Sequence, residues 1–147
     1  YRGLASYGQI PHGAFYLCLT GLICALTDIF AFLVGSRFGR HKLAPRVSPG
    51  KSIEGALGGL FVTVIVLFLL FSRFFTDSLG FVLYLIAVSV LGQLGDLSMS
   101  AVKRVAGVKD FGKIFPGHGG ILDRLDSLMY PLAFTWLLFC FKIWIFT

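Results

Sequence analysis

Four apolar stretches, separated by polar segments, account for most of the chain. They cover residues 13–35, 55–75, 79–101 and 127–146, and each comes close to the roughly 20 residues that a helix needs to cross about 30 Å of hydrocarbon. Because backbone polar groups find no partners in lipid, each stretch is expected to form a helix. The short link at residues 72–78 predicts that the second and third helices form an antiparallel pair.

The composition agrees with this pattern. Hydrophobic residues make up 56% of the chain, aromatic residues 16%, and the mean hydropathy is +0.85, which is outside the usual range of soluble domains. We therefore predict an all-α integral membrane protein: a polytopic bundle of about four transmembrane helices with two polar cytoplasmic loops. Residues 1–147 are interpreted as a single membrane domain, and a chain that opens with Tyr1 and no recognisable leader is expected to be a piece of a longer polypeptide.

Positive charge is concentrated in the two long polar segments, residues 36–54 and 103–126. They hold ten of the thirteen lysines and arginines, and because two spans separate them, both segments lie on one side of the membrane. The bias of Lys and Arg toward the cytoplasm assigns that side. The net charge of +6 could suggest nucleic acid, but these cations flank the spans without interleaved exposed aromatics. We expect anionic lipid or a phosphorylated substrate, and no nucleic acid.

Two acidic residues, Asp28 and Asp96, fall inside predicted spans. Burying a carboxylate there costs roughly 2.5–3.5 kcal/mol on insertion scales, so such residues usually have a role or a partner. Each lies about seven residues from the cytoplasmic end of its span, which places both at a depth of about 10 Å. A functional pair is one interpretation, and an ion pair with a cation of a neighbouring helix is the other.

Asp96, Ser100 and Lys103 follow at i, i+4 and i+7. This spacing puts a carboxylate, a hydroxyl and an ammonium on one helical face and predicts a polar groove that runs toward the cytoplasm. The earlier pair Ser48-Pro49 is expected to cap and start a helix. Lys51, near that start, would then reach the phosphates of a phosphorylated substrate. The alternative is that Lys51 contacts only anionic lipid headgroups.

The second polar segment adds further candidates. "PGHGG" at residues 116–120 predicts irregular backbone whose N–H groups can bind an anion. Asp123 and Asp126 are spaced i, i+3 at the start of the next helix, and oxygen ligands of this kind suit Mg²⁺; stabilising the helix N-terminus is the alternative for Asp126. His118 is interpreted as a phosphate donor or a residue that orders the loop.

Carboxylates beside cations at the mouth of a membrane bundle favour phosphoryl or nucleotidyl transfer to a lipid phosphate. An ion-coupled transporter with intramembrane aspartates is the main alternative. Transfer to a different lipid phosphate is another, whereas the motif of the CDP-alcohol phosphotransferases is not found.

These residues, in fixed register, resemble the signature of the phosphatidate cytidylyltransferases, the CDP-diacylglycerol synthases. The matching positions are Ser100, Lys103, Arg104, Lys109, Asp110, Pro116, His118, Gly119, Gly120, Asp123, Arg124 and Asp126. The stretch "SPGKSIEG" at residues 48–55 is similar to a second element of that family. The resemblance covers nearly the whole chain and identifies it with the C-terminal, catalytic portion of such enzymes.

The resemblance implies an Mg²⁺-dependent enzyme that makes CDP-diacylglycerol and pyrophosphate from CTP and phosphatidate, with K⁺ as a second cation and a homodimer as the assembly. A bacterial inner membrane is expected from the short loops. The resemblance makes Asp96 and Asp123 metal ligands, with Asp126 and Asp28 as further candidates, and assigns catalytic roles also to Ser100, Lys103 and Arg104. Phosphate binding is expected of Lys51, Lys109, Lys113, His118, Gly119, Gly120 and Arg124.

Overall fold

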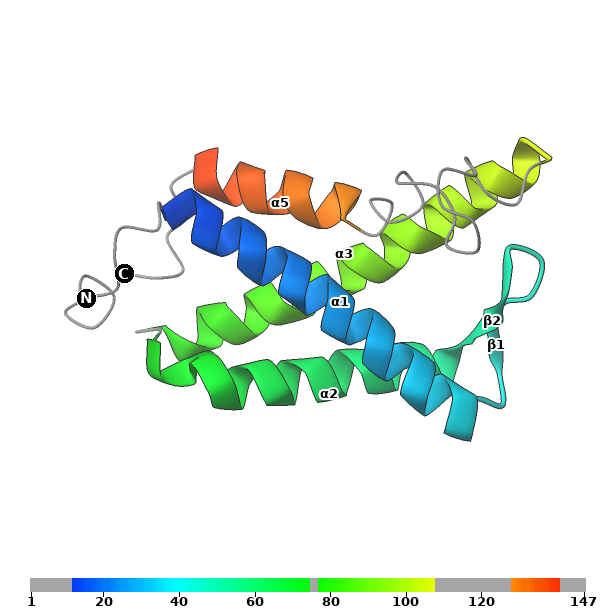
Figure 1. Ribbon diagram of the computed structural model, residues 1–147, viewed down its shortest axis with the longest axis horizontal. Helices are drawn as coiled ribbons and strands as arrows, with labels where there is room; N and C mark the ends of the chain where they lie inside the picture. Colours follow the sequence, from blue (N-terminus) through cyan, green and yellow to red (C-terminus); the bar gives the residue numbers. More distant parts are fainter. Residues whose placement is uncertain (1–11, 75–76, 108–127, 141–147) are drawn as a thin grey trace, which may run out of the picture.

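The computed structural model describes residues 12–74, 77–107 and 128–140 (Figure 1). The helices in this part of the chain are α1 (His12–Phe38), α2 (Ile53–Phe71), α3 (Ser78–Val105) and α5 (Met129–Cys140). The first three are each long and apolar enough to cross a membrane. The all-α membrane architecture is therefore confirmed. The fourth expected span coincides with α5, a shorter apolar helix, over the residues that are described.

A short 3₁₀ turn, η1 (Ser72–Phe74), follows α2 and leads to α3, which runs back beside α2 (Figure 1). The side chain of Asp77 begins α3 by accepting a hydrogen bond from the backbone N–H of Gly80, at 3.1 Å. The expected antiparallel pair of helices is thus confirmed. Outward-facing side chains such as Phe61, Ile65 and Leu69 are exposed on α2, as is usual for helices that face lipid.

Helix α1 packs closely against α2, because both helices present small residues at their contact. A Cβ atom on Gly55 would lie 2.6 Å from the carbonyl oxygen of Ala31, and one on Gly59 would lie 2.7 Å from that of Thr27. Only glycine permits such an approach of two backbones. The two helices are therefore held at a fixed separation over the stretch that includes Asp28.

At the other end of the bundle, a cluster of hydroxyl groups links three helices. Thr20 on α1, Tyr84 on α3 and Thr135 on α5 lie within hydrogen-bond distance of one another, at 2.8 Å for Thr20–Tyr84 and 3.1 Å for the other two pairs. All three side chains are buried. The apolar core beside them includes Ile23, Leu67, Phe81, Leu85 and Val88.

The first polar segment forms a β-hairpin and does not lead into a helix at Ser48. Its strands β1 (Lys42–Ala44) and β2 (Ser48–Ser52) form an antiparallel hairpin in which Lys42 is paired with Ser52. The expectation that Ser48-Pro49 starts a helix is wrong. The N-cap is Ser52, whose backbone is extended and whose Oγ accepts a hydrogen bond from the N–H of Gly55, at 3.1 Å.

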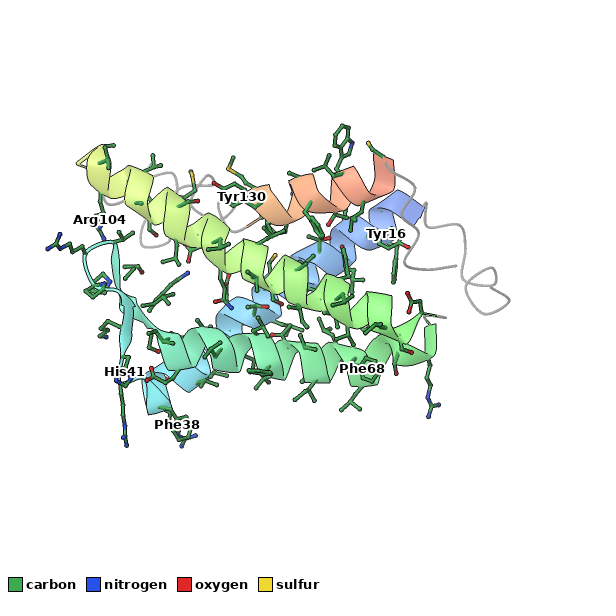
Figure 2. The ribbon with its side chains drawn as sticks, turned by 180° about the vertical axis from the view of Figure 1, so that it is seen from behind. Tyr16, Phe38, His41, Phe68, Arg104 and Tyr130 are labelled. Carbon is green, nitrogen blue, oxygen red and sulfur yellow. The ribbon has the colours of Figure 1, made fainter. Side chains whose placement is uncertain are left out.

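The reason for this difference lies in α2 itself. Glu54, in the first turn of α2, accepts hydrogen bonds from the backbone N–H groups of Arg40 and His41, each at 3.2 Å, and its Oε1 lies 2.6 Å from His41 Nδ1. These contacts fix the base of the hairpin, where His41 is labelled in Figure 2. Pro49, which has no N–H to donate, is tolerated in a two-stranded hairpin because both strands are edges.

Candidate functional site

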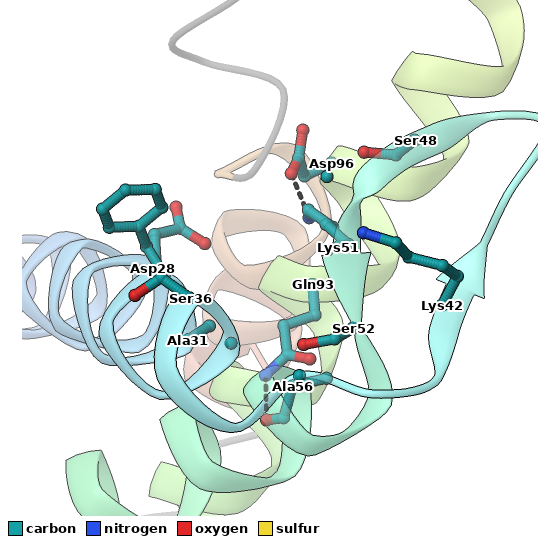
Figure 3. A pocket seen from close by; sticks show the side chains of 14 residues that line it. Asp28, Ala31, Ser36, Lys42, Ser48, Lys51, Ser52, Ala56, Gln93 and Asp96 are labelled. Atoms are coloured by element: carbon teal, nitrogen blue, oxygen red, sulfur yellow. Dashed lines mark hydrogen bonds and ion pairs between the residues drawn. The ribbon is translucent and has the colours of Figure 1, made fainter.

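A cavity of about 690 Å³ lies where the hairpin meets α1, α2 and α3 (Figure 3). Each element supplies part of its wall. The polar lining residues are Asp28 and Ser36 from α1, Lys42, Ser48, Lys51 and Ser52 from the hairpin, and Gln93 and Asp96 from α3. Because the cavity is bordered by apolar helices and a basic hairpin, it can receive a molecule with a charged head at the end of the bundle.

An ion pair between Lys51 and Asp96 lies in the cavity and is drawn as a dashed line in Figure 3. Lys51 comes from β2, and Asp96 from the middle of α3, so the pair joins the hairpin to a membrane helix. The two side chains are only 29% and 27% exposed. Screening by water is therefore weaker than for a surface pair. The alternative that Asp96 pairs with a cation of a neighbouring helix is wrong in its partner, because the cation, Lys51, belongs to the hairpin.

Asp28 contributes the second carboxylate of the cavity. It projects from α1, on the opposite wall from the hairpin (Figure 3). Its neighbours Thr27 and Ala31 are the residues that α2 approaches through Gly59. The backbone that carries Asp28 is therefore tightly held. Asp28 and Asp96, which were expected at a similar depth in separate helices, line the same cavity.

Gln93 lies one turn before Asp96 on α3 and fixes this helix against α2. Its side-chain Nε2 donates a hydrogen bond to the backbone carbonyl of Ala56, at 3.0 Å. Nearby, Gly92 and Gly95 are buried, and Ser98 Oγ donates to the carbonyl of Gly95 at 2.8 Å. The part of the cavity wall formed by Gln93 and Ala56 is thus held by a hydrogen bond between two helices.

The other candidates on α3 do not line this cavity. Ser100, Lys103 and Arg104 lie in the last turns of the helix, beyond Asp96. Lys103 is buried, whereas Arg104 is exposed and its Nε donates to the carbonyl of Val47, at 3.3 Å. Figure 2 shows Arg104 beside the turn of the hairpin. In this structure Arg104 therefore supports the hairpin, and the expected continuous groove from Asp96 to Lys103 is not part of the cavity.

The remaining candidates lie outside the described residues. These are Lys109, Asp110, Lys113, His118, Gly119, Gly120, Asp123, Arg124 and Asp126. The meeting of Asp96 with Asp123 therefore stays a prediction.

The described carboxylates can be tested for their fit to a metal ion. Within residues 12–74, 77–107 and 128–140, no group of three or more His, Cys, Asp or Glu residues is placed to hold one. Mg²⁺, however, is usually bound through one or two carboxylates together with water and substrate phosphates. Asp28 and Asp96 each present a carboxylate to the cavity, which therefore supplies ligands of the kind that such a site combines with a phosphorylated substrate.

Sequence reasoning missed five polar lining residues, which are Ser36, Lys42, Ser48, Ser52 and Gln93. Gln93 could have been found, because it precedes Asp96 by three positions and so lies on the same face of the helix. Nothing in the sequence distinguished Lys42 from the other cations of its segment. Its place in the cavity depends on the pairing of β1 with β2.

The chain matches the sequence model of a protein family described as the cytidylyltransferase family, over residues 2–141. Proteins named phosphatidate cytidylyltransferase from Staphylococcus haemolyticus (strain JCSC1435) and Staphylococcus aureus (strain COL) are 46% and 49% identical to it over 128 residues, which is 86% of this chain and 49% of each relative. A protein of the same name from Haemophilus influenzae is 42% identical over 139 residues, 89% of this chain and 48% of the relative. The chain thus spans about half the length of the curated relatives it matches.

Proposed function

The chain belongs to the cytidylyltransferase family. We therefore propose that it is the part that carries the active site in a membrane enzyme that makes CDP-diacylglycerol and pyrophosphate from CTP and phosphatidate. The relatives named above carry that activity in their names. The single observation that supports it best is the shared cavity of Asp28, Asp96, Lys42 and Lys51. It brings two carboxylates and two cations to the place where membrane helices meet a polar hairpin.

The reaction joins a water-soluble triphosphate to a lipid phosphate. An oxygen of the phosphatidate phosphate forms a bond to the α-phosphorus of CTP, and the bond from that phosphorus to the bridging oxygen of the β-phosphate breaks, so that pyrophosphate leaves. A phosphate oxygen is already ionised at neutral pH, so no side chain has to remove a proton. The work left to the protein is to hold both phosphates in line and to neutralise their charge.

The residues of the cavity suit these tasks. Bound Mg²⁺ would neutralise the triphosphate and stabilise the departing pyrophosphate, and Asp28 and Asp96 are the described residues that would hold it. Lys42 and Lys51 carry flexible ammonium groups that suit phosphate oxygens. Asp123 and the other candidates outside the described residues would complete the site. The dependence on K⁺, the homodimer and the bacterial inner membrane belong to the same proposal.

The test is an assay of pyrophosphate release by the purified full-length protein with CTP, phosphatidate and Mg²⁺, with EDTA and the omission of each substrate as controls. Asp96→Asn should lower turnover at least 100-fold, because it removes a charge from the cavity. Asp77→Asn is the matched control, since Asp77 is exposed and caps α3 at the opposite end of that helix. It should keep wild-type turnover. Full activity of Asp96→Asn, or a wild-type protein that moves ions but releases no pyrophosphate, would contradict the proposal.

A further inference from the structure

Lys51 and Asp96 are bound to each other in this structure, although their proposed roles give them different partners. Asp96 is a candidate metal ligand, and Lys51 is a candidate phosphate ligand. The ion pair engages both groups at once. A metal ion at Asp96 or a phosphate at Lys51 would each compete with this ion pair.

Electrostatics links the two roles. A divalent cation at Asp96 would stand a few ångströms from the Lys51 ammonium, and like charges at that distance repel strongly in a partly buried site. An ammonium that loses its carboxylate in such a place needs another anion, since an uncompensated charge away from bulk water is costly. The phosphate of a substrate is the anion that would arrive with the metal.

The structure allows the side chain of Lys51 to move while its backbone stays in place. The hairpin is fixed at its base by Glu54, which binds His41 at 2.6 Å, and at its turn by Arg104, which donates to Val47. Lys51 itself has a four-carbon stem with free rotation. Its neighbour Gly50 has open space around it. A change of partner therefore needs side-chain rotation alone.

We propose that Lys51 is an exchangeable counter-ion: it neutralises Asp96 before substrate binds, and it transfers to a substrate phosphate when a divalent cation takes the carboxylate. This inference rests on the proposed function and adds to it the order in which Lys51 changes its ionic partners. Lys51 competes with the metal for Asp96 and assists the metal in holding phosphate. The same residue should thus have opposite effects on the two ligands.

The test uses full-length protein in detergent, with Mn²⁺ as the metal probe, whose free fraction is measured by electron paramagnetic resonance. Lys51→Met should tighten Mn²⁺ binding in the absence of nucleotide, with a Kd roughly tenfold lower, which corresponds to about 1.4 kcal/mol. Lys51→Arg, which keeps the charge, should stay within about threefold of the wild type. Arg46→Gln is the matched control, because it removes a cation from the exposed turn of the same hairpin, away from the cavity. It should leave the Kd of Mn²⁺ unchanged.

The second half of the experiment measures phosphate binding at saturating Mn²⁺. CTP and phosphatidate are titrated separately, because either could supply the phosphate that Lys51 contacts. Lys51→Met should weaken one of them by fivefold or more, and the arm that responds identifies the source. Unchanged or weaker Mn²⁺ binding by Lys51→Met overturns the inference, as does tighter Mn²⁺ binding with both substrates bound as in the wild type.

A measurement on the wild type covers the case in which Lys51→Met does not fold. The rate at which Lys51 is acetylated by a limiting amount of acetic anhydride is followed by mass spectrometry. Mg²⁺ alone should raise this rate, because the ammonium leaves Asp96, and the further addition of CTP or phosphatidate should lower it again. A rate that does not respond to Mg²⁺ would contradict the exchange. Pyrophosphate release by the same wild-type preparation is measured in parallel, so that a failure of the exchange is told apart from a failure of the proposed function.

Discussion

The contact between α1 and α2 allows a quantitative prediction, because a single methyl group tests it. A Cβ atom at position 59 would meet Ala31 N and Thr27 O at 2.7 Å, whereas ordinary contacts begin at 3.4 Å. Gly59→Ala therefore forces the helices about 0.7 Å apart. The atoms in the way are backbone atoms of Thr27 and Ala31 and the Cβ of Ala31, so no side-chain rotation relieves the clash.

The expected cost follows from this geometry. Overpacking of this kind destabilises by about 1–3 kcal/mol, which lowers the midpoint of thermal unfolding by about 3–10 °C for a chain of this size. Thr27 and Ala31 also flank Asp28, so the displacement moves one carboxylate of the cavity. Misplacement by about 1 Å can cost up to roughly 100-fold in rate, and we expect turnover of Gly59→Ala to fall at least tenfold.

Gly21→Ala provides the matched control. Gly21 also lies within a membrane helix, α1, but a Cβ atom there meets nothing within 4 Å. Both substitutions gain the same helix propensity, so their difference isolates the clash. The assay is thermal unfolding in detergent, together with pyrophosphate release from CTP and phosphatidate. If Gly59→Ala unfolds and turns over like Gly21→Ala, the close packing of α1 on α2 is refuted.

Three further substitutions test other parts of the structure. Tyr84→Phe removes the hydroxyl group that lies within hydrogen-bond distance of both Thr20 and Thr135, so it should lower the free energy of unfolding by about 1 kcal/mol and leave turnover unchanged. A loss of turnover at an unchanged unfolding midpoint would contradict this structural role. Thr63→Val should leave the free energy of unfolding unchanged or raise it by up to about 1 kcal/mol, since the buried Thr63 hydroxyl has no hydrogen-bond partner among the described residues. A clearly lower midpoint of thermal unfolding would argue against this account. Glu54→Ala removes the contacts that hold the base of the hairpin, so the KM for CTP should rise more than kcat falls. An unchanged KM would show that the hairpin is held by other contacts.

The membrane helices were predictable because helices in lipid need long apolar stretches. Such stretches can be recognised in the sequence without knowledge of the tertiary structure. The three long helices begin and end within four residues of the predicted spans, and α3 continues to Val105. Ser100, at the end of the predicted span, and Lys103, in the extension, both lie beyond the cavity. Their common face with Asp96 was a sound inference from helix periodicity, but periodicity does not say how far along the helix a cavity extends.

The hairpin and its ion pair were less accessible to sequence reasoning. Ser48 and Ser52 are both plausible caps, and the contacts of Glu54 with Arg40 and His41 decide between them. The pairing of Lys51 with Asp96 joins positions 45 residues apart and depends on where the hairpin folds. A pattern along the chain can identify Asp96 as an unusual residue, but it cannot name its partner.

The central claim is that Asp28, Asp96 and Lys51 surround one site for phosphorylated substrates. An experimental structure of the full-length protein with CTP and Mg²⁺ tests it most directly. The account predicts the triphosphate in the cavity between the hairpin and α3, with Asp96 directed toward the metal ion and the Lys51 ammonium moved toward a phosphate. A triphosphate bound elsewhere, with the ion pair between Lys51 and Asp96 still closed, would contradict it.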